Sequence, residues 1–307
     1  MSVIGIDTSN YTTSIAWFDG ISGENCSRLL PVKQGELGLR QSDAVFAHTK
    51  SLPELSGRLF SHVQDGSITA IGVSTRPRAV EGSYMPCFMV GYSHAKLLSD
   101  VLHIPLVEVS HQQGHVAASL WSANRLDLMD QPHLAWHLSG GTTELLLVEP
   151  DDKNVICTKI GGTSDISAGQ LIDRTGQLLQ LPFPSGKHLD TLSREAMGNE
   201  VFKVKCTNMT FSLSGVQNKV QQFHASNTIP AETAAYALRC VAKAVYLATE
   251  QALKAYPGLP VVFSGGVASN SMLRQIMEPL EPIFALPQFS TDNAMGVAVL
   301  AHRITEG

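Results

Sequence analysis

Two histidines four residues apart are the first feature of this sequence that suggests chemistry. His111 and His115 lie in the segment Glu108–His115, which we expect to end a strand and begin a helix with Ser110 as the N-cap. Residues at this spacing share one helix face, with Cβ atoms about 5–6 Å apart, which suits two imidazoles on one metal ion. For two histidines at this spacing with no further ligand, the alternative is that both lie on a helix surface and make ordinary hydrogen bonds.

A carboxylate far along the chain is the candidate for a third ligand. Asp292 stands just before the last expected helix, and the N-cap of that helix is its alternative role. A zinc peptidase would need glutamate directly after the first histidine as its general base. That position is Gln112, whose amide cannot take a proton. Peptidase activity is therefore not expected, and spacing alone leaves both roles of Asp292 open.

Two Ser-Gly-Gly turns are the second chemical signal. The first glycine turn, Ser139–Gly141, separates two apolar segments, and the second glycine turn, Ser264–Gly266, joins an apolar strand to a helix. Glycine lets the backbone approach an anion, and a strand, a glycine turn and a helix N-terminus together form a phosphate or nucleotide site. An ordinary glycine-rich hairpin is the alternative for the first turn alone. The chain has neither a P-loop nor a G-x-G-x-x-G motif.

The elements that must position these residues repeat one plan. Strands are expected at residues 3–7 and 13–18 around a polar turn, and again at 133–138 and 145–148 around the first glycine turn. Further helices are expected near 40–63, 87–101, 166–181, 188–197, 214–225, 231–256, 268–277 and 292–304, with strands at 70–74, 106–110, 261–264 and near 284. This order predicts an α/β protein of the actin-like ATPase (ASKHA) architecture, with mixed sheets flanked by helices and a cleft between two duplicated lobes. We expect the lobes at residues 1–130 and 131–307, with the last helix able to pack back on the N-terminal lobe.

Composition narrows the class of protein. The 307 residues are 44% hydrophobic and carry a net charge of -5, which is the wrong sign for a protein that holds nucleic acid over its whole surface. No apolar run reaches the roughly 18 residues of a membrane span, and we expect a cytoplasmic protein with no membrane partner. The five cysteines are odd in number and widely spaced, which predicts buried free thiols.

Eight motifs in register extend these signals to nearly the whole chain. They are Gly5–Ser9, His111–His115, Ser139–Thr143, Gly169–Asp173, Phe183–Gly186, Phe211–Gly215, Ser264–Asn270 and Thr291–Asn293. With them the chain resembles the tRNA threonylcarbamoyladenosine transferase family, which is TsaD-like and was formerly classed as glycoprotease or peptidase M22.

This resemblance implies an adenylate-binding actin-like fold and one divalent or ferric metal ion, iron or zinc, on His111, His115 and Asp292. The ligand would be ATP or an acyl-adenylate. A carboxylate accepts hydrogen bonds from a ribose diol, which suits Asp173 and Asp190, although surface helix carboxylates are their alternative reading. The nucleotide-binding residues, including the second glycine turn, would be Leu138, Ser139, Gly140, Gly141, Thr142, Asp173, Gly186, Asp190, Gly265, Gly266 and Asn270.

Departures from the family pattern indicate a divergent paralogue. The family continues its first motif with Cys-Asp-Glu-Thr, so two carboxylates are replaced here by Tyr11 and Thr12. Its Gly-Pro-Gly loop is Arg76-Pro77-Arg78, and paired guanidinium groups can bind a carboxylate or phosphate. Solvated arginines or structural ion pairs are the alternative. The residues expected to set substrate specificity are Asp7, Ser9, Tyr11, Arg76 and Arg78.

The function that follows from the resemblance is transfer of a carbamoyl or threonylcarbamoyl group from an adenylate, with the adenosine next to the tRNA anticodon as the family acceptor. Two alternatives remain open: a paralogue that carbamoylates a non-tRNA acceptor, and a non-catalytic nucleotide-binding subunit of the same fold. A small-molecule kinase is the least favoured, because it has no use for the histidine pair. Expected partners are an adenine nucleotide, tRNA, and either a companion subunit of the same fold or a second copy. The acceptor, the metal and the oligomeric state stay open.

Overall fold

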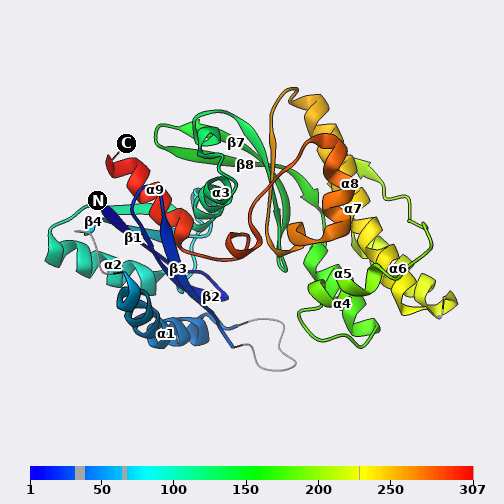
Figure 1. Ribbon diagram of the computed structural model, residues 1–307, viewed down its shortest axis with the longest axis horizontal. Coiled ribbons are helices and arrows are strands. Elements are labelled where there is room, and N and C mark those ends of the chain that lie inside the picture. The colour runs from blue at the N-terminus through cyan, green and yellow to red at the C-terminus, as the bar shows by residue number, and fades with distance from the viewer. Residues whose placement is uncertain (32–38, 64–67, 228, 307) are drawn as a thin grey trace. The chain divides into compact units, whose positions relative to one another are not determined.

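The chain forms two compact units, each with its own sheet. The computed structural model describes residues 1–31, 39–63, 68–227 and 229–306 (Figure 1). Unit 1 contains Met1–Gln131, Glu149–Cys157 and Asp292–Gly307, and unit 2 contains Pro132–Val148 and Thr158–Thr291. The expected lobe boundary at residues 130 and 131 stays a prediction.

Unit 1 is built on a five-stranded mixed sheet of order β3-β2-β1-β4-β5. The antiparallel part is β1 (Ser2–Thr8), β2 (Thr12–Phe18) and β3 (Gly23–Leu29). β4 (Ile68–Arg76) lies parallel to β1, and β5 (Leu106–Ser110) lies parallel to β4. Because both neighbours of β1 cover its edges, this strand is buried along its whole length. Its end carries Asp7 and Ser9 into the site described below.

Four helices cover both faces of this sheet: α1 (Gln41–His62), α2 (Phe88–Leu102), α3 (His111–Ser122) and α9 (Met295–Glu306). Side chains alternate between the faces of a strand. Ile4 and Ile6 of β1 therefore pack with α1 residues such as Leu55, while Gly5 between them faces α9. A Cβ on Gly5 would lie 2.5 Å from the Ala294 carbonyl oxygen, so glycine lets α9 pack directly on the sheet.

The approach of α3 to α9 is still closer. A Cβ on Gly296 would lie 1.8 Å from the carbonyl oxygen of Gly114, so the backbones of the two helices touch. Gly114 precedes His115, and Gly296 lies four residues after Asp292. This glycine pair therefore brings two segments that are distant in sequence into contact beside the predicted metal ligands.

Unit 2 contains most of a seven-stranded mixed sheet of order β12-β11-β6-β7-β8-β10-β9. Its strands are β6 (His133–Leu138), β7 (Thr143–Asp151), β8 (Asn154–Thr163), β9 (Cys206–Thr207), β10 (Thr210–Phe211), β11 (Val261–Ser264) and β12 (Ile283–Phe284). Its helices are α4 (Ala168–Leu178), α5 (Gly186–Ser193), α6 (Ser214–Ser226), α7 (Pro230–Ala255) and α8 (Ser271–Met277) (Figure 1). The long α7 buries an alanine-rich side in the core that also contains Trp136 and Phe263.

Short 3-10 turns complete the chain at Leu126–Asp130, Gly266–Ser269, Glu278–Leu280 and Pro287–Phe289. All five cysteines are free thiols, as predicted, but the predicted burial is wrong for Cys157 and Cys206, which are only partly buried. Within the described residues, no helix combines the length and the apolar character that a membrane span requires.

Two expected helix starts are wrong, both for reasons of capping. The helix expected from residue 268 begins at Ser271, because the Asn270 side chain accepts the Leu273 N–H and a 3-10 turn precedes it. The last helix begins at Met295 rather than near residue 292, where the Asn293 side chain accepts the Met295 N–H. Asp292 is therefore not the cap of α9, and its carboxylate is available for other contacts.

Candidate metal centre and nucleotide-binding turns

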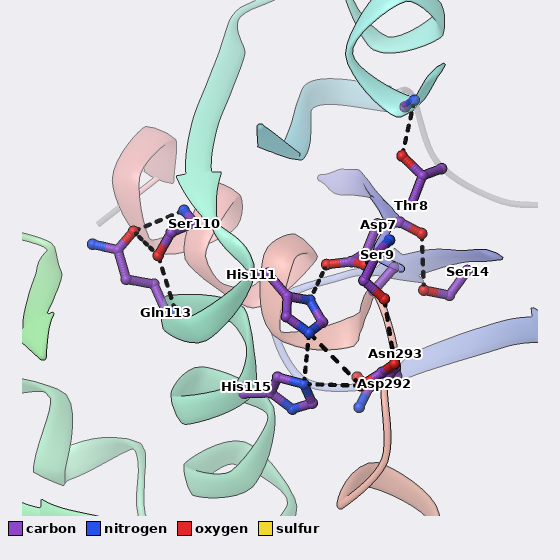
Figure 2. Close-up of polar contacts among 12 residues, drawn as sticks. Asp7, Thr8, Ser9, Ser14, Ser110, His111, Gln113, His115, Asp292 and Asn293 are labelled. Carbon is purple, nitrogen blue, oxygen red and sulfur yellow. Dashed lines mark hydrogen bonds and ion pairs between the residues drawn. The ribbon is translucent and has the colours of Figure 1, made fainter. Parts of the chain in front are cut away.

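The predicted metal ligands converge at the start of α3. Ser110 ends β5 and caps α3 in a capping box: its Oγ accepts the Gln113 N–H at 3.2 Å, and Gln113 Oε1 accepts the Ser110 N–H at 2.8 Å. His111 is thus the first residue of the helix, and His115 follows one turn later on the same face (Figure 2). His111 Nε2 and His115 Nε2 lie 3.0 Å apart.

Asp292 completes this group from the segment before α9. Its Oδ1 lies 3.2 Å from His115 Nε2 and 3.7 Å from His111 Nε2. We call His111, His115 and Asp292 the metal group; all three belong to unit 1. Their side chains are 17%, 5% and 28% exposed, so the ligand atoms are largely shielded but still open on the side of Asp292.

The metal group fits a small transition metal. One atom from each residue lies within 4.8 Å of the others. Ligands bound at about 2.0–2.1 Å in tetrahedral geometry lie roughly 3.3 Å from one another, close to the three separations in this group. Two imidazoles and one carboxylate suit zinc, and the same set suits non-haem iron with positions left for substrate. The residues therefore fit either of the expected metals.

A further carboxylate supports the metal group from β1 (Figure 2). Asp7 Oδ2 accepts from His111 Nδ1 at 2.7 Å, and Asp7 Oδ1 accepts the Ser9 N–H at 2.9 Å. The Ser9 hydroxyl donates to Asp292 Oδ2 at 3.3 Å. Asp7 and Ser9 therefore both have contacts with the metal group, and the substrate-specificity role expected for them stays a prediction.

The charges of this group shift its pKa values strongly. Burial alone would lower the pKa of His111, but the carboxylates of Asp7 and Asp292 outweigh it and raise that pKa to about 10. Burial raises the pKa of Asp292, yet hydrogen bonds and charge from His111 and His115 hold it well below the ordinary value of 3.8. Without metal, His111 is therefore an imidazolium between carboxylates at neutral pH.

This arrangement predicts how pH changes the stability of the metal-free protein. The raised pKa of His111 gives a stabilising contribution that is complete below its ordinary pKa of 6.5 and is lost as pH rises toward about 10. The lowered pKa of Asp292 gives a contribution that is present above 3.8 and is lost in acid. After chelator treatment, we expect the melting temperature of wild type to exceed that of His111→Gln. This difference should be largest at about pH 4–6.5 and should decrease toward pH 10. A constant difference across that range would contradict the assigned charges.

The first glycine turn joins β6 to β7 in unit 2 and presents two backbone donors. At the two ends of this turn, the N–H groups of Ser139 and Thr142 bond within the turn itself, and the expected role of both residues in nucleotide binding stays a prediction. Ser139 N–H donates to the Thr142 carbonyl at 2.8 Å, and Thr142 N–H donates to Ser139 Oγ at 3.0 Å, because these bonds close the turn. Gly140 and Gly141 are exposed, and their N–H groups donate to no group in the described part of the chain. A Cβ on either would have no atom within 4 Å.

Two other glycines pack tightly on this turn. Gly265 of the second glycine turn has φ +91°, and a Cβ there would lie 2.2 Å from the Leu138 carbonyl oxygen. Gly169, in the first turn of α4, would place a Cβ 2.4 Å from Gly140 Cα. The structure thus brings both glycine turns and the start of α4 together, and Gly266 opens onto free space like Gly141. Gly169 is a packing residue that spacing alone did not reveal.

The remaining predicted nucleotide-binding residues lie on α4, on α5 and just before α8. Asp173 of α4 accepts the Ser185 N–H at 2.8 Å, next to Gly186 at the start of α5, and burial raises its pKa. Asp190 Oδ1 accepts from Asn270 Nδ2 at 2.8 Å and from Ser271 Oγ at 2.7 Å. Asp190 and Asn270 therefore join α5 to α8, and their contact with a ribose stays a prediction.

The loop that carries Arg76 and Arg78 contacts the start of α3. Arg76 ends β4, pairs with Ser110 and is exposed, while the Gln112 N–H donates to the Pro77 carbonyl at 3.0 Å. Arg78 is also exposed, and its N–H donates to Ser83 Oγ at 3.0 Å. Tyr11 lies between β1 and β2 with 39% of its surface exposed. The role of these residues in substrate specificity stays a prediction.

The sequence of this chain is similar to those of a known protein family. The family model described as tRNA N6-adenosine threonylcarbamoyltransferase matches residues 36–299. A protein of that name from Carboxydothermus hydrogenoformans is 30% identical over 325 aligned residues, covering 99% of this chain and 93% of its own. One from a Sulfurihydrogenibium species is 31% identical, covering 99% and 90%. The chain belongs to the TsaD family. The predicted family is therefore confirmed, and so is the predicted enzyme class, an acyl transferase, at the level of the family.

Solved structures confirm the predicted actin-like fold. The crystal structure of full-length HypF in a phosphate- and nucleotide-bound form superposes with TM-score 0.63 at 15% identity, covering 100% of this chain and 47% of HypF, so this TsaD-family chain spans about half of that protein. The (R)-2-hydroxyglutaryl-CoA dehydratase component A of Acidaminococcus fermentans gives TM-score 0.59 at 14% identity, and the ROK hexokinase of Thermus thermophilus gives 0.54 at 14%, each covering 100% of both chains.

Proposed function

We propose that this chain is a metal-dependent transferase that takes a threonylcarbamoyl or carbamoyl group from an adenylate, with the adenosine next to the tRNA anticodon as its acceptor. The observation that carries the proposal is the metal group: two imidazole nitrogens and a carboxylate oxygen converge within 4.8 Å in a member of the TsaD family. A non-catalytic companion subunit would have no need of such ligands. That alternative is therefore disfavoured.

His111, His115 and Asp292 would hold the metal ion. When bound there, iron or zinc would act as a Lewis acid toward the acyl oxygen, which is worth several kcal/mol in the transition state. The residues of the chain keep the two imidazoles on one helix face and hold Asp292 beside them. Capping of α3 by Ser110 and the contact of Gly114 with Gly296 stabilise this arrangement.

The adenylate would bind in unit 2. Gly140 and Gly141 offer exposed N–H groups with open space beside them, which suits a phosphate whose charge increases as the acyl group leaves. Asp173 has one carboxylate oxygen on the Ser185 N–H, leaving the second for a ribose hydroxyl. ATP, or an acyl-adenylate made from it, is the proposed ligand.

A non-tRNA acceptor is the second candidate. It is favoured by Tyr11 and Thr12, which replace two family carboxylates, and by exposed Arg76 on the loop that touches the start of α3. Guanidinium groups at this place suit an acidic acceptor better than a small loop would. We also propose a cytoplasmic location for this chain, and either a companion subunit of the same fold or a second copy of the chain as its protein partner.

Nucleoside analysis of tRNA tests the proposed acceptor. Cells with and without this gene are compared by mass spectrometry of their digested tRNA, and a matched strain carries the gene with His115→Ala. We expect less threonylcarbamoyladenosine without the gene and recovery only with the wild-type gene. An unchanged level in all strains would contradict tRNA as the acceptor and favour the second candidate.

A further inference from the structure

We infer that Asp7 is a positioning residue that holds both ligand-bearing segments of the metal group in register with β1. The inference rests on the proposed metal site. Asp7 lies at the end of a fully buried strand, where it contacts the His111 ring directly and is linked to the Asp292 segment through Ser9. Figure 2 shows its carboxylate between the His111 ring and the backbone of Ser9.

Burial limits what the carboxylate of Asp7 contacts, and its expected role in substrate specificity stays a prediction. The residue is 0% exposed, so its side chain is enclosed by neighbouring residues of the chain. A buried carboxylate is stable only when it is paired and hydrogen-bonded. Both oxygens of Asp7 meet this condition, with Oδ2 on His111 Nδ1 at 2.7 Å and Oδ1 on the Ser9 N–H at 2.9 Å. Its effect on the reaction must therefore pass through these two partners.

The bond to His111 decides which ring nitrogen faces the metal. An ionised carboxylate only accepts hydrogen bonds, so the Nδ1 atom of His111 must carry a proton. In the metal-bound ring the lone pair is then on Nε2, the atom that points to His115 and Asp292. The same bond fixes rotation of the ring. Carboxylates that orient histidine ligands in this way typically raise metal affinity by about 10–100-fold.

The hydrogen bond from Ser9 to Asp7 also influences the orientation of the third ligand, Asp292. Asp7 fixes the backbone of Ser9, and the Ser9 hydroxyl donates to Asp292 Oδ2 at 3.3 Å. Asp292 Oδ1, the other oxygen, is the one that faces the histidines. One buried carboxylate thus orients His111 directly and Asp292 through Ser9. This explains why β1, which contributes no ligand, ends beside the metal group.

Zinc affinity tests the inference without any assay of transfer. Purified full-length wild type, Asp7→Asn, Asp7→Ala and Ser14→Ala are titrated with zinc against a chromophoric chelator. Ser14 is the matched control, because its hydroxyl contacts the backbone carbonyl of Asp7 at 3.3 Å but not the carboxylate. We expect affinity to fall by about 10–100-fold in Asp7→Ala, by less in Asp7→Asn, which keeps an acceptor, and to stay unchanged in Ser14→Ala.

Cobalt spectra and thermal melts complete the test. Visible absorption of bound Co²⁺ reports ligand geometry, and we expect its bands to change in both Asp7 variants but not in Ser14→Ala. If Asp7→Ala does not fold, the nearly isosteric Asp7→Asn decides. Wild-type affinity and spectra in folded Asp7 variants would overturn the positioning role while leaving the metal site intact. A wild-type protein that binds neither zinc nor cobalt would overturn the proposed metal site, and the role of Asp7 with it.

Discussion

Alanine in place of His115 is expected to abolish high-affinity metal binding and to reduce transfer by roughly 10²–10³-fold. His115 Nε2 lies 3.0 Å from His111 Nε2 and 3.2 Å from Asp292 Oδ1, so the substitution removes one of three ligand atoms at the centre of the group. A Lewis acid supplies several kcal/mol to the transition state, and each 1.36 kcal/mol is about tenfold in rate. The loss of affinity should exceed the roughly 10–100-fold effect of a supporting residue.

His94→Ala is the matched control for this substitution. His94 lies on α2 of the same unit, and its Nδ1 contacts the Val90 carbonyl of its own helix at 2.8 Å. Zinc titration and single-turnover transfer should be unchanged in this variant. Unchanged metal content in both His115→Ala and His111→Ala would mean that the pair makes only ordinary helix-surface hydrogen bonds.

Two glycine substitutions are expected to separate nucleotide binding from folding. Gly141 has open space where a Cβ would be and lies outside the left-handed φ region, so Gly141→Ala should change stability by no more than about 0.5 kcal/mol. The new methyl group would obstruct the approach of a phosphate to the turn. A hydrogen bond to a charged group is worth about 1.5–3 kcal/mol, so ATP affinity should fall by about tenfold or more.

Gly265→Ala should behave in the opposite way. Its φ of +91° and the distance of 2.2 Å from a Cβ to the Leu138 carbonyl oxygen predict a loss of about 1–3 kcal/mol in stability. Denaturant unfolding and calorimetric titration with ATP measure both quantities in each variant. ATP binding at wild-type affinity by folded Gly141→Ala would contradict a phosphate site at the first glycine turn.

Local signals in the sequence were sufficient for much of the fold. The capping pattern at Ser110 and the spacing of His111 and His115 predicted the start of α3 correctly, because these interactions lie within a few residues. β3 was missed, since it is an edge strand with mostly exposed polar residues and lacks the alternation of a buried strand. The start of α9 was misplaced because Asp and Asn both cap helices, and here Asn293 does so.

The contacts that complete the site lay beyond such signals. His115 and Asp292 are 177 residues apart, and Asp7 and His111 are 104 apart. Residue types alone left Asp292 open as either a ligand or a helix cap until the family resemblance favoured the ligand, and nothing in the sequence indicated that Asp7 orients His111. Likewise, the turn-closing bonds of Ser139 and Thr142 depend on the conformation of the hairpin, which residue types alone do not determine.

Metal content of the purified chain tests the central claim most directly. Inductively coupled plasma mass spectrometry of freshly purified wild-type protein, after gel filtration in metal-free buffer, should find one iron or zinc ion per chain. The same preparation of His115→Ala should contain almost none. A wild-type chain that is free of both metals, and that binds neither when it is added, would contradict a metal centre at His111, His115 and Asp292.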